Sequence, residues 1–401
     1  MAITGSVALT NQIKPLYDSE FLVQSQALLY FDQCSDLKKQ IGAAGGSSYE
    51  FPISANLPPA TAVLNELEDV TPLPLSSAAV NVPVYEHGSA VQVTELAVQT
   101  SYVDVYKQAA YANGYQLAES YDNLVRAVVC QGSMILRQAA ATTRATFAGK
   151  TNTAHIVTPA YLQLLVSIAR RFRVPAAEDG SYMTVIDAFV HHDLIVNTNI
   201  RDMAIRQTPE MAFNGEVAYW AGLRILTSAN CKGFYGAGAV DATASAATTL
   251  ASSSAAGATS ISVASATNIT VGQWLAIIDG AETGNTWTDT NELALVTAVS
   301  GTDITVMGSD PGPGTGGGLR YAHASGTTVN NGNSVYPIPI MGPMSITKVA
   351  GDHTGPYGRT TVVGPYDTLG RFLALGWYAI VGWQRTLEGW IMRGEVGSSI
   401  S

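Results

Sequence analysis

The chain has few charged residues, few cysteines and no apolar run long enough to cross a membrane. Charged residues make up 13% of its 401 residues, whereas ordinary soluble domains carry about 25%. So little charge leaves more of the surface able to contact other protein surfaces. The net charge of −10 argues against a protein that finds nucleic acid by electrostatic attraction alone, although it does not exclude a protein that encloses nucleic acid.

The cysteines argue against a disulfide framework and show no metal-binding spacing. Cys34, Cys130 and Cys231 are far apart and odd in number, so we expect small buried side chains in a protein that folds in a reducing cytoplasm. The first residues lack the basic start and apolar core of a signal peptide. The longest apolar run, residues 372–383, is too short to span a bilayer.

Motifs for catalysis and ligand binding are also missing. Residues 149–151 (Gly-Lys-Thr) resemble the end of a phosphate-binding loop, but Arg144 stands where that motif needs glycine. His191 and His192 are adjacent at an expected strand end, so their side chains point apart, and no third ligand is evident. No Gly-x-Ser-x-Gly nucleophile motif occurs. We therefore expect neither an enzyme nor a cofactor or metal site.

Residues 40–106 contain no lysine or arginine, and the next such residue is Lys107. Within this span, residues 49–53 (Tyr-Glu-Phe-Pro-Ile) and 82–85 (Val-Pro-Val-Tyr) alternate apolar and polar side chains, as strands do. Residues 60–74 between them are acidic and rich in proline. An isolated two-stranded hairpin is marginally stable in water, and no adjacent segment offers a cover. We therefore expect neighbouring copies of the chain to cover it.

The candidate subunit-interface residues come from these strands and from the acidic tip. They are Tyr49, Phe51, Leu64, Val82, Val84, Tyr85, Glu66 and Glu68. The apolar members are expected to bury surface against a neighbour. The acidic members fit either a solvated turn or a partner contact.

The sequence after this arm predicts a long helix from about residue 101 to 149, with a break near Asn113-Gly114. Leu117, Val128 and Ile135 are spaced by eleven and seven residues, which returns to nearly the same face of a helix. Three arginines follow nine residues later, on the opposite face: Arg126, Arg137 and Arg144.

A second group of arginines lies close together in sequence and comprises Arg170, Arg171 and Arg173. Both groups are candidates for a basic surface that faces the interior of an assembly or a partner. A solvated face with local ion pairs is the more ordinary interpretation of such clusters.

Other segments predict shorter elements. We expect helices at residues 25–40 and 158–171, a strand at 182–189, a helix beginning near residue 192, and a strand pair at 216–225. The helix at 158–171 has a proline near its start, where proline is favoured.

From about residue 237 to 333 the composition changes to alanine, serine, threonine and glycine, and Arg320 is the only arginine or lysine. Four short alternating runs predict strands near residues 261–263, 274–278, 292–296 and 304–306. We expect a small inserted all-β domain flanked by flexible seams. Its lack of basic residues favours exposure to solvent over contact with packed DNA.

The order of these segments resembles that of tailed-phage major capsid proteins with the Hong Kong 97 fold, in particular the coliphage N-four type family. Residues 49–60, 189–193 (Phe-Val-His-His-Asp), 215–228 and 367–396 carry the resemblance. It implies an α+β fold with an N-terminal arm, an extended β-hairpin loop, a long spine helix, and peripheral and axial domains. The chain departs from the family pattern at residues 237–333.

The resemblance also implies a domain organisation. Residues 1–48 would form the N-terminal arm, 49–100 the extended loop hairpin, 101–190 the spine helix and peripheral domain, 191–236 the first part of the axial domain, 237–335 the inserted β-rich domain, and 336–401 the return through the axial and peripheral domains.

The implied function is a structural one. The chain would self-assemble, as pentamers and hexamers, into the icosahedral capsid of a tailed bacteriophage virion, formed in the host cytoplasm around double-stranded DNA without sequence specificity. Expected partners are other copies, a cement or decoration protein on the inserted domain, a scaffold and a portal, with no membrane. No lysine lies between Lys39 and Lys107, so a lysine of this loop cannot cross-link the shell. The alternatives are a cellular encapsulating compartment and a carbohydrate-active enzyme.

Overall fold

The chain folds into two compact units, each built from segments that are far apart in sequence. The structure is a computed structural model and describes residues 29–41, 46–54, 56–61, 63–64, 66, 69–70, 72–101, 104–196, 216–228, 230–239, 246–280, 288, 290–309, 317–365, 369 and 371–401. In these ranges the first unit comprises Ser35–Tyr121 and Ile346–Thr386, and the second Tyr30–Cys34, Asp122–Ser345 and Leu387–Ser401. Residues 1–28 of the expected arm, and Glu68, lie outside them.

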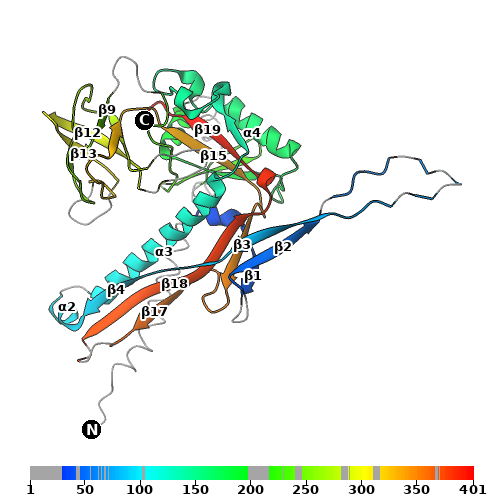
Figure 1. The fold of residues 1–401 in the computed structure, drawn as a ribbon, viewed down its shortest axis with the longest axis horizontal. Helices are drawn as coiled ribbons and strands as arrows, with labels where there is room; N and C mark the ends of the chain where they lie inside the picture. The colour runs from blue at the N-terminus through cyan, green and yellow to red at the C-terminus, as the bar shows by residue number, and fades with distance from the viewer. Residues whose placement is uncertain are drawn as a thin grey trace, which may run out of the picture. The chain divides into compact units, whose positions relative to one another are not determined.

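The first unit is built around one long strand (Figure 1). Its sheet has the order β1-β16-β18-β17, and β4 also pairs with β18. The elements are β1 (Ser35–Ile41), β2 (Ser48–Ser54), β3 (Ser77–Pro83), β4 (Tyr85–Thr94), α2 (Glu95–Thr100), the first part of α3 (Val105–Cys130), β16 (Ile346–Gly351), β17 (Arg359–Val363) and β18 (Phe372–Arg385).

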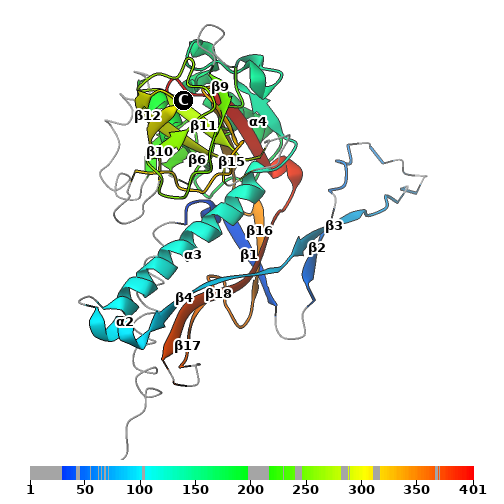
Figure 2. The ribbon, with the colours of Figure 1, turned by 60° about the vertical axis from the view of Figure 1, so that its left-hand side comes forward.

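The first part of helix α3, up to Tyr121, packs along this sheet, as Figure 2 shows from a second side. The small side chains of Ala109 and Ala110 are buried with Val93 of β4 and Leu375 of β18. Asn113 is buried and its Nδ2 donates to the Leu375 carbonyl oxygen over 3.0 Å. The expected break at Asn113-Gly114 is therefore wrong, because Asn113 faces the sheet and the helix continues.

The predicted extent of the long helix is also wrong. The helix begins at Val105 and ends at Cys130, and Gly132 follows with φ 130°, which is a conformation that favours glycine. Residues 135–137 then form the short strand β5. Arg137 and Arg144 consequently do not share a helix face with Arg126.

The helix predicted at residues 25–40 is wrong for residues 29–40, the part that the structure describes. Phe31–Cys34 form a 3-10 helix, η1, and Ser35–Ile41 form β1. Strand β1 pairs in parallel with β16, which lies some 300 residues later in the chain. A parallel partner so distant leaves no local signal in the sequence.

The second unit contains a six-stranded sheet of order β5-β19-β15-β6-β8-β7. Its elements are η1, β5 (Ile135–Arg137), η2 (Gln138–Ala140), η3 (Arg144–Thr146), η4 (Thr153–His155), α4 (Pro159–Arg171), β6 (Tyr182–Ile186), α5 (Ala188–Val196), β7 (Glu216–Trp220), β8 (Leu223–Thr227), β15 (Val335–Met341), η5 (Glu388–Trp390) and β19 (Ile391–Gly397). The helix predicted at 158–171 and the strand pair predicted at 216–225 are confirmed.

Two helices cover the core of this sheet. Leu162 and Leu165 of α4 are fully buried with Ile338 and Ile340 of β15. Helix α4 begins as predicted, because the Thr158 hydroxyl accepts a hydrogen bond from the Tyr161 backbone N–H over 3.3 Å, a standard N-cap. Helix α5 begins four residues earlier than expected.

The inserted segment forms a second six-stranded sheet with its own core. The strands are β9 (Ala247–Thr249), β10 (Ser260–Ser262), β11 (Trp274–Ile278), β12 (Glu292–Ser300), β13 (Asp303–Met307) and β14 (Thr328–Asn330), in the order β10-β13-β12-β11-β14-β9. All neighbours are antiparallel. Leu275, Ile277, Val296, Ile304 and Val329 fill the core. The four strands predicted from alternation are confirmed.

Backbone hydrogen bonds hold the described residues at the two ends of the inserted segment, and the flexibility of the seams stays a prediction. Phe234 and Val335 exchange backbone hydrogen bonds. The Gly238 N–H donates to the Asn333 carbonyl over 2.7 Å, and the Ala239 N–H donates to the Phe147 carbonyl over 2.6 Å. A Cβ at Gly238 would lie 2.7 Å from both of these oxygens, so only glycine fits. The inserted sheet is thus tied to the rest of its unit.

One histidine, His323, lies fully buried in the inserted domain between two carboxylates. Its Nδ1 lies 2.9 Å from Asp279 Oδ2, and its Nε2 lies 2.7 Å from Glu292 Oε1. Burial lowers the pKa of His323, but the hydrogen bonds and charges of Glu292 and Asp279 outweigh it, so the pKa is raised. The His323 side chain joins the end of β11 and the start of β12 to the segment that precedes β14.

Raising the pH is expected to destabilise the inserted sheet through His323. The folded protein binds this proton more tightly than the unfolded chain, in which histidine titrates near 6.5. The stabilisation is therefore complete below about pH 6.5 and is lost as the pH rises through the folded pKa. Thermal unfolding from pH 5.5 to 9 should show a gap between wild type and His323→Gln that narrows with pH. Parallel pH profiles for the two proteins would contradict this assignment.

Candidate assembly surface

The arm expected from sequence alternation is an antiparallel hairpin of β2 and β3. Tyr49 lies opposite Val82, and Phe51 lies opposite Val80. Directly paired residues share one face of a sheet, so these four side chains and Ile53 lie together. The rings of Tyr49 and Phe51 are 4.6 Å apart between centroids. The alternation at residues 49–53 therefore predicts this apolar face correctly. The strand predicted at 82–85 is wrong in its bounds, because β3 ends at Pro83 and Tyr85 begins β4.

The base of the hairpin is anchored in the first unit. Val82 is fully buried, and the Val84 N–H donates to the Ser47 carbonyl over 3.0 Å. Residue 382 of β18 must be glycine, because a Cβ there would overlap the Pro83 carbonyl oxygen. Strand β4 then pairs with β18 along its whole length. The hairpin thus has a base that is fixed against β18.

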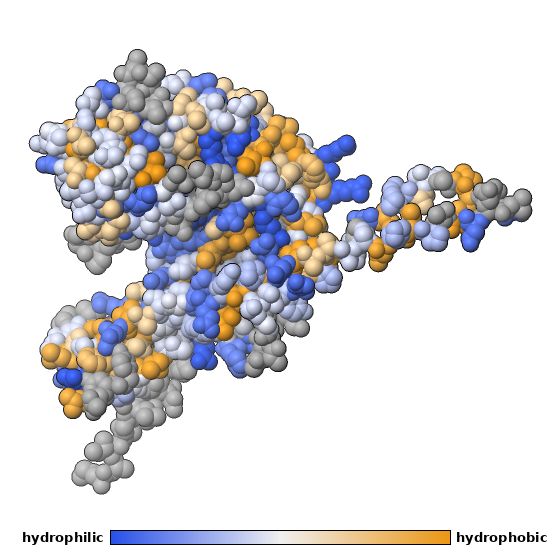
Figure 3. Space-filling model, in the orientation of Figure 1, coloured by the Kyte–Doolittle hydropathy of each residue, from blue (hydrophilic) through white to orange (hydrophobic). Residues whose placement is uncertain are grey.

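The far end of the hairpin has no comparable cover. The described residues between 56 and 76, called the loop tip here, form no helix or strand, and Figure 1 shows them running out beyond the ends of β2 and β3. Their large apolar side chains are exposed and contribute the orange patches in this part of Figure 3: Leu57, Val63, Leu64, Val70, Leu73 and Leu75. An exposed apolar surface of this extent marks an interaction site.

The other predicted interface residues are divided between exposed and covered positions. Leu64 is 72% exposed and Tyr85 is 62% exposed, and Glu66 is exposed as well. Tyr49, Phe51 and Val84 are half-buried. Val82 instead stabilises the fold of the single chain, because it is buried at the base of the hairpin.

Two of the predicted basic residues, Arg137 and Arg144, form an internal charged cluster with Glu395. Arg137 Nε lies 2.8 Å from Glu395 Oε2, and Arg144 Nη2 lies 2.8 Å from Oε1. Arg393, which is itself buried, places Nη2 3.1 Å from Oε1. The Glu395 side chain is fully buried, and a buried charge of this kind requires such partners.

The remaining predicted arginines occupy two different settings. Arg126 is buried, and its Nη1 donates to Asn123 Oδ1 over 2.8 Å and to the Asn230 carbonyl over 2.5 Å. Arg170, Arg171 and Arg173 are exposed at the end of α4 and just after it, where the helix dipole favours cations. Only this second group forms a basic surface open to a partner.

Sequence reasoning missed the buried carboxylate of Asp122. Its Oδ1 accepts the backbone N–H groups of Tyr30 and Phe31 over 3.0 and 2.9 Å, and its Oδ2 accepts Asn230 Nδ2 over 3.1 Å. Burial raises the pKa of Asp122, and these hydrogen bonds only partly counter it. The contact fixes η1 in the second unit. It joins residues about 90 apart, so no local pattern could reveal it.

Asp122→Ala is expected to release η1 and lower the unfolding free energy by about 1–3 kcal/mol, because two buried N–H groups lose their acceptor. Hydrogen exchange at Tyr30 and Phe31 should accelerate. The matched variant Asp122→Asn retains a carbonyl oxygen for both N–H groups and should have the smaller effect. Equal exchange rates in all three proteins would show that Asp122 does not hold this segment.

Among the described residues, the cysteine, histidine and acidic side chains form neither a disulfide nor a metal site. The three cysteines are buried and unpaired with one another, and burial raises the pKa of Cys34 to about 12. In the described ranges, no group of three or more His, Cys, Asp and Glu side chains is arranged to hold a metal ion. No helix in the same ranges is both long and apolar enough to cross a membrane.

Comparisons with known proteins identify the fold. No family model and no curated protein sequence matches the chain. Among solved structures, it is similar to the capsid of Ralstonia phage GP4, with a TM-score of 0.55 and 11% identity over 91% of this chain and 86% of that one. It is also similar to the capsid of cyanophage P-SCSP1u, with a TM-score of 0.52 and 14% identity over 91% and 87%.

Because these identities are low, the matches show similarity of fold alone. The matched regions cover most of each chain. They do not test the narrower resemblance to the N-four type family, which stays a prediction. The expected α+β class and the expected Hong Kong 97-like fold are confirmed: the chain has the fold of these phage capsid structures.

Proposed function

We propose that the chain is the major capsid protein of a tailed bacteriophage and not an enzyme. Copies of it would assemble as pentamers and hexamers into an icosahedral shell that encloses double-stranded DNA. The proposal is supported by the fold shared with phage capsid structures. The protein would be located in the virion, after assembly in the host cytoplasm.

The exposed loop tip supports this proposal independently of the fold similarity. The hairpin base is fixed within its own unit, but the loop tip exposes six large apolar side chains that no described part of the same chain covers. Burying one such side chain contributes about 1.5–3 kcal/mol, so a partner surface is strongly favoured. A repeating shell supplies that surface from the next identical subunit.

The roles of the chain segments follow from this proposal. Residues 49–100 would be the extended loop, 101–190 the spine helix and peripheral domain, and 191–236 with 336–401 the axial domain and the return. The inserted domain, residues 237–335, would face outward and contact neighbours or a decoration protein. Scaffold, portal and packaged DNA are the remaining proposed partners.

Analytical ultracentrifugation with negative-stain electron microscopy of the purified chain tests the proposal. We expect large closed particles. A protein that stays monomeric at high concentration would contradict it. The contents of the particles distinguish a phage capsid from a cellular compartment. Enclosed double-stranded DNA would support the capsid, and an enclosed enzyme would support the compartment.

Denaturing gels of mature particles should show only the monomer band at 42.1 kDa. The loop contains no lysine between Lys39 and Lys107, so no lysine of the loop can form a cross-link, and the proposed contacts are non-covalent. A ladder of covalent oligomers that survives heating in detergent and reductant would contradict this expectation.

A further inference from the structure

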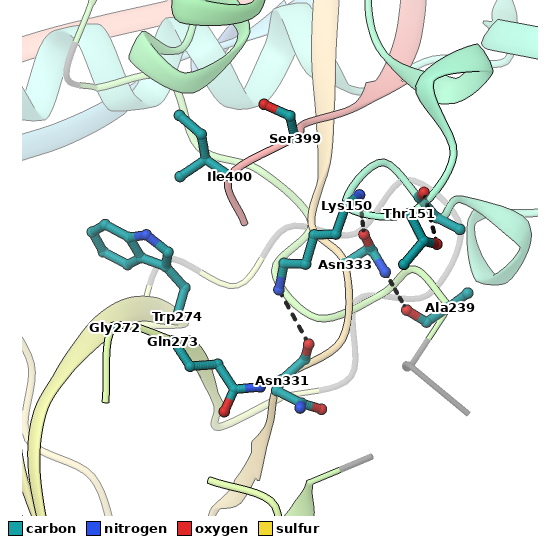
Figure 4. A pocket seen from close by; sticks show the side chains of 11 residues that line it. Lys150, Thr151, Ala239, Gly272, Gln273, Trp274, Asn331, Asn333, Ser399 and Ile400 are labelled. Atoms are coloured by element: carbon teal, nitrogen blue, oxygen red, sulfur yellow. Dashed lines mark hydrogen bonds between the residues drawn. The ribbon is translucent and has the colours of Figure 1, made fainter. Parts of the chain in front are cut away.

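A hollow of about 560 Å³ opens in the second unit beside the inserted sheet (Figure 4). Five segments that are distant in sequence form its walls: the loop after η3, residue 239, the start of β11, the chain just after β14, and residues 399–400. Its lining includes Lys150, Thr151, Gln273, Trp274, Asn331 and Ile400. Its volume falls in the range of small-molecule sites, about 300–1,000 Å³.

A lysine without a counter-charge faces this hollow. Lys150 is half-buried, and its Nζ donates to the Asn331 carbonyl over 3.2 Å. No carboxylate among the described residues forms an ion pair with it. A cation held away from water lacks compensation unless an anion binds beside it. The site therefore favours a negatively charged ligand.

The opposite wall is aromatic. Trp274 is half-buried, and its ring contacts Phe189 at an angle of 65° with 5.0 Å between centroids. Figure 4 shows the Trp274 indole and Ile400 on the side of the hollow away from Lys150. A tryptophan held by its neighbour offers a rigid flat surface that can pack against the C–H groups of a ligand ring.

Polar side chains between these two walls can both donate and accept hydrogen bonds. Gln273 Oε1 accepts the Thr270 N–H over 3.2 Å, and its Nε2 has no partner among the described residues. The Thr151 hydroxyl lies at the exposed side. By contrast, the Asn333 side chain is fully occupied by Lys150 N and the Ala239 carbonyl, so it shapes the hollow. Amides and hydroxyls suit a ligand with several hydroxyl groups.

From these contacts we propose that the hollow binds a carboxylated sugar, such as a uronic acid. Lys150 binds the carboxylate, the Trp274 ring packs on the sugar face, and Gln273 and Thr151 contact the hydroxyl groups. A simple carboxylate would leave the aromatic wall unused, and a neutral sugar would leave the lysine uncompensated. This site is independent of the proposed shell function, since none of these residues belongs to the loop tip.

Saturation-transfer NMR and calorimetric titration of the full chain, or of its particles, test the proposal with glucuronate as probe. Glucuronate should bind at least about tenfold more tightly than glucose or succinate, because only glucuronate satisfies both walls. Lys150→Gln keeps a donor for the Asn331 carbonyl and should remove the preference for glucuronate over glucose. Lys107→Gln makes the same charge change at an exposed position on α3 and should leave it unchanged.

The remaining outcomes would overturn the proposal. No detectable glucuronate binding would show that the hollow is not such a site. Equal binding of succinate, or of an acidic peptide, would show a general anion site that does not recognise sugar. An unchanged preference in a folded Lys150→Gln variant would remove Lys150 from the site. Gln273→Ala serves as the second variant and should weaken glucuronate binding. It is preferred to Trp274→Ala, which would also remove the packing of Trp274 on Phe189.

Discussion

Replacing Leu64 and Leu73 of the loop tip by aspartate is expected to abolish particle assembly while the subunit stays folded. The two side chains are 72% and 58% exposed, so the fold of a single chain does not depend on them. In a shell, burial of each would contribute about 1.5–3 kcal/mol. The double variant should therefore lower the association constant by roughly 10²–10⁴-fold. Sedimentation velocity measures the assembled fraction, and circular dichroism monitors the fold.

The matched control introduces the same charges elsewhere. Tyr111 and Tyr115 of α3 are 47% and 41% exposed, and their double replacement by aspartate should leave assembly nearly unchanged. If the loop-tip variant assembled normally, the loop would not be the main contact between subunits. If both variants failed equally, added negative charge would be the cause.

Glu395→Gln is expected to cause the largest loss of stability among single substitutions in the second unit. Arg137, Arg144 and Arg393 all point their guanidinium groups at this one carboxylate. Removing its charge leaves buried cations without compensation, which typically costs about 3–5 kcal/mol. Chemical denaturation of the unassembled chain measures the free energy of unfolding.

An exposed ion pair provides the comparison. Arg224 Nη2 lies 2.7 Å from Asp179 Oδ2, but the two side chains are 44% and 40% exposed, so Asp179→Asn should change stability little. Removing Arg144 in the Glu395→Gln background should cost less than removing it from wild type, because the two residues act as a pair. Equal losses for Glu395→Gln and Asp179→Asn would contradict the internal role of the cluster.

The sequence predicts the hairpin and the inserted strands because their signal is local. Residues 49–53 and the run near 304 alternate every second residue, and each lies in a strand with one face more covered than the other. The run near 274 is a short apolar segment that lies in a buried strand. The capped start of the helix at Pro159 is equally local. The order of these elements along the chain was sufficient to predict the fold class.

The long helix was overestimated because apolar spacing alone does not show where a helix ends. Ile135 continues the pattern of Leu117 and Val128, yet it lies in a strand beyond Gly132. The arginines assigned to the opposite face show the same error. Arg144 pairs with a carboxylate about 250 residues away, and that partner cannot be recognised from spacing.

The features that the sequence did not reveal all depend on distant segments. Strand β1 pairs with β16, Asp122 caps the chain near Phe31, and the hollow beside Lys150 needs the inserted sheet to complete it. The loop tip, by contrast, could be recognised from the sequence, because it lacks basic residues and is rich in proline.

A cryo-electron microscopy map of the assembled particle would show whether the loop tip is a contact between subunits. We expect density for residues 56–76 packed against an adjacent identical subunit, with the leucines of the loop tip buried there. A closed shell in which these residues project into solvent without touching a neighbour would contradict it, as would a purified chain that forms no shell at all.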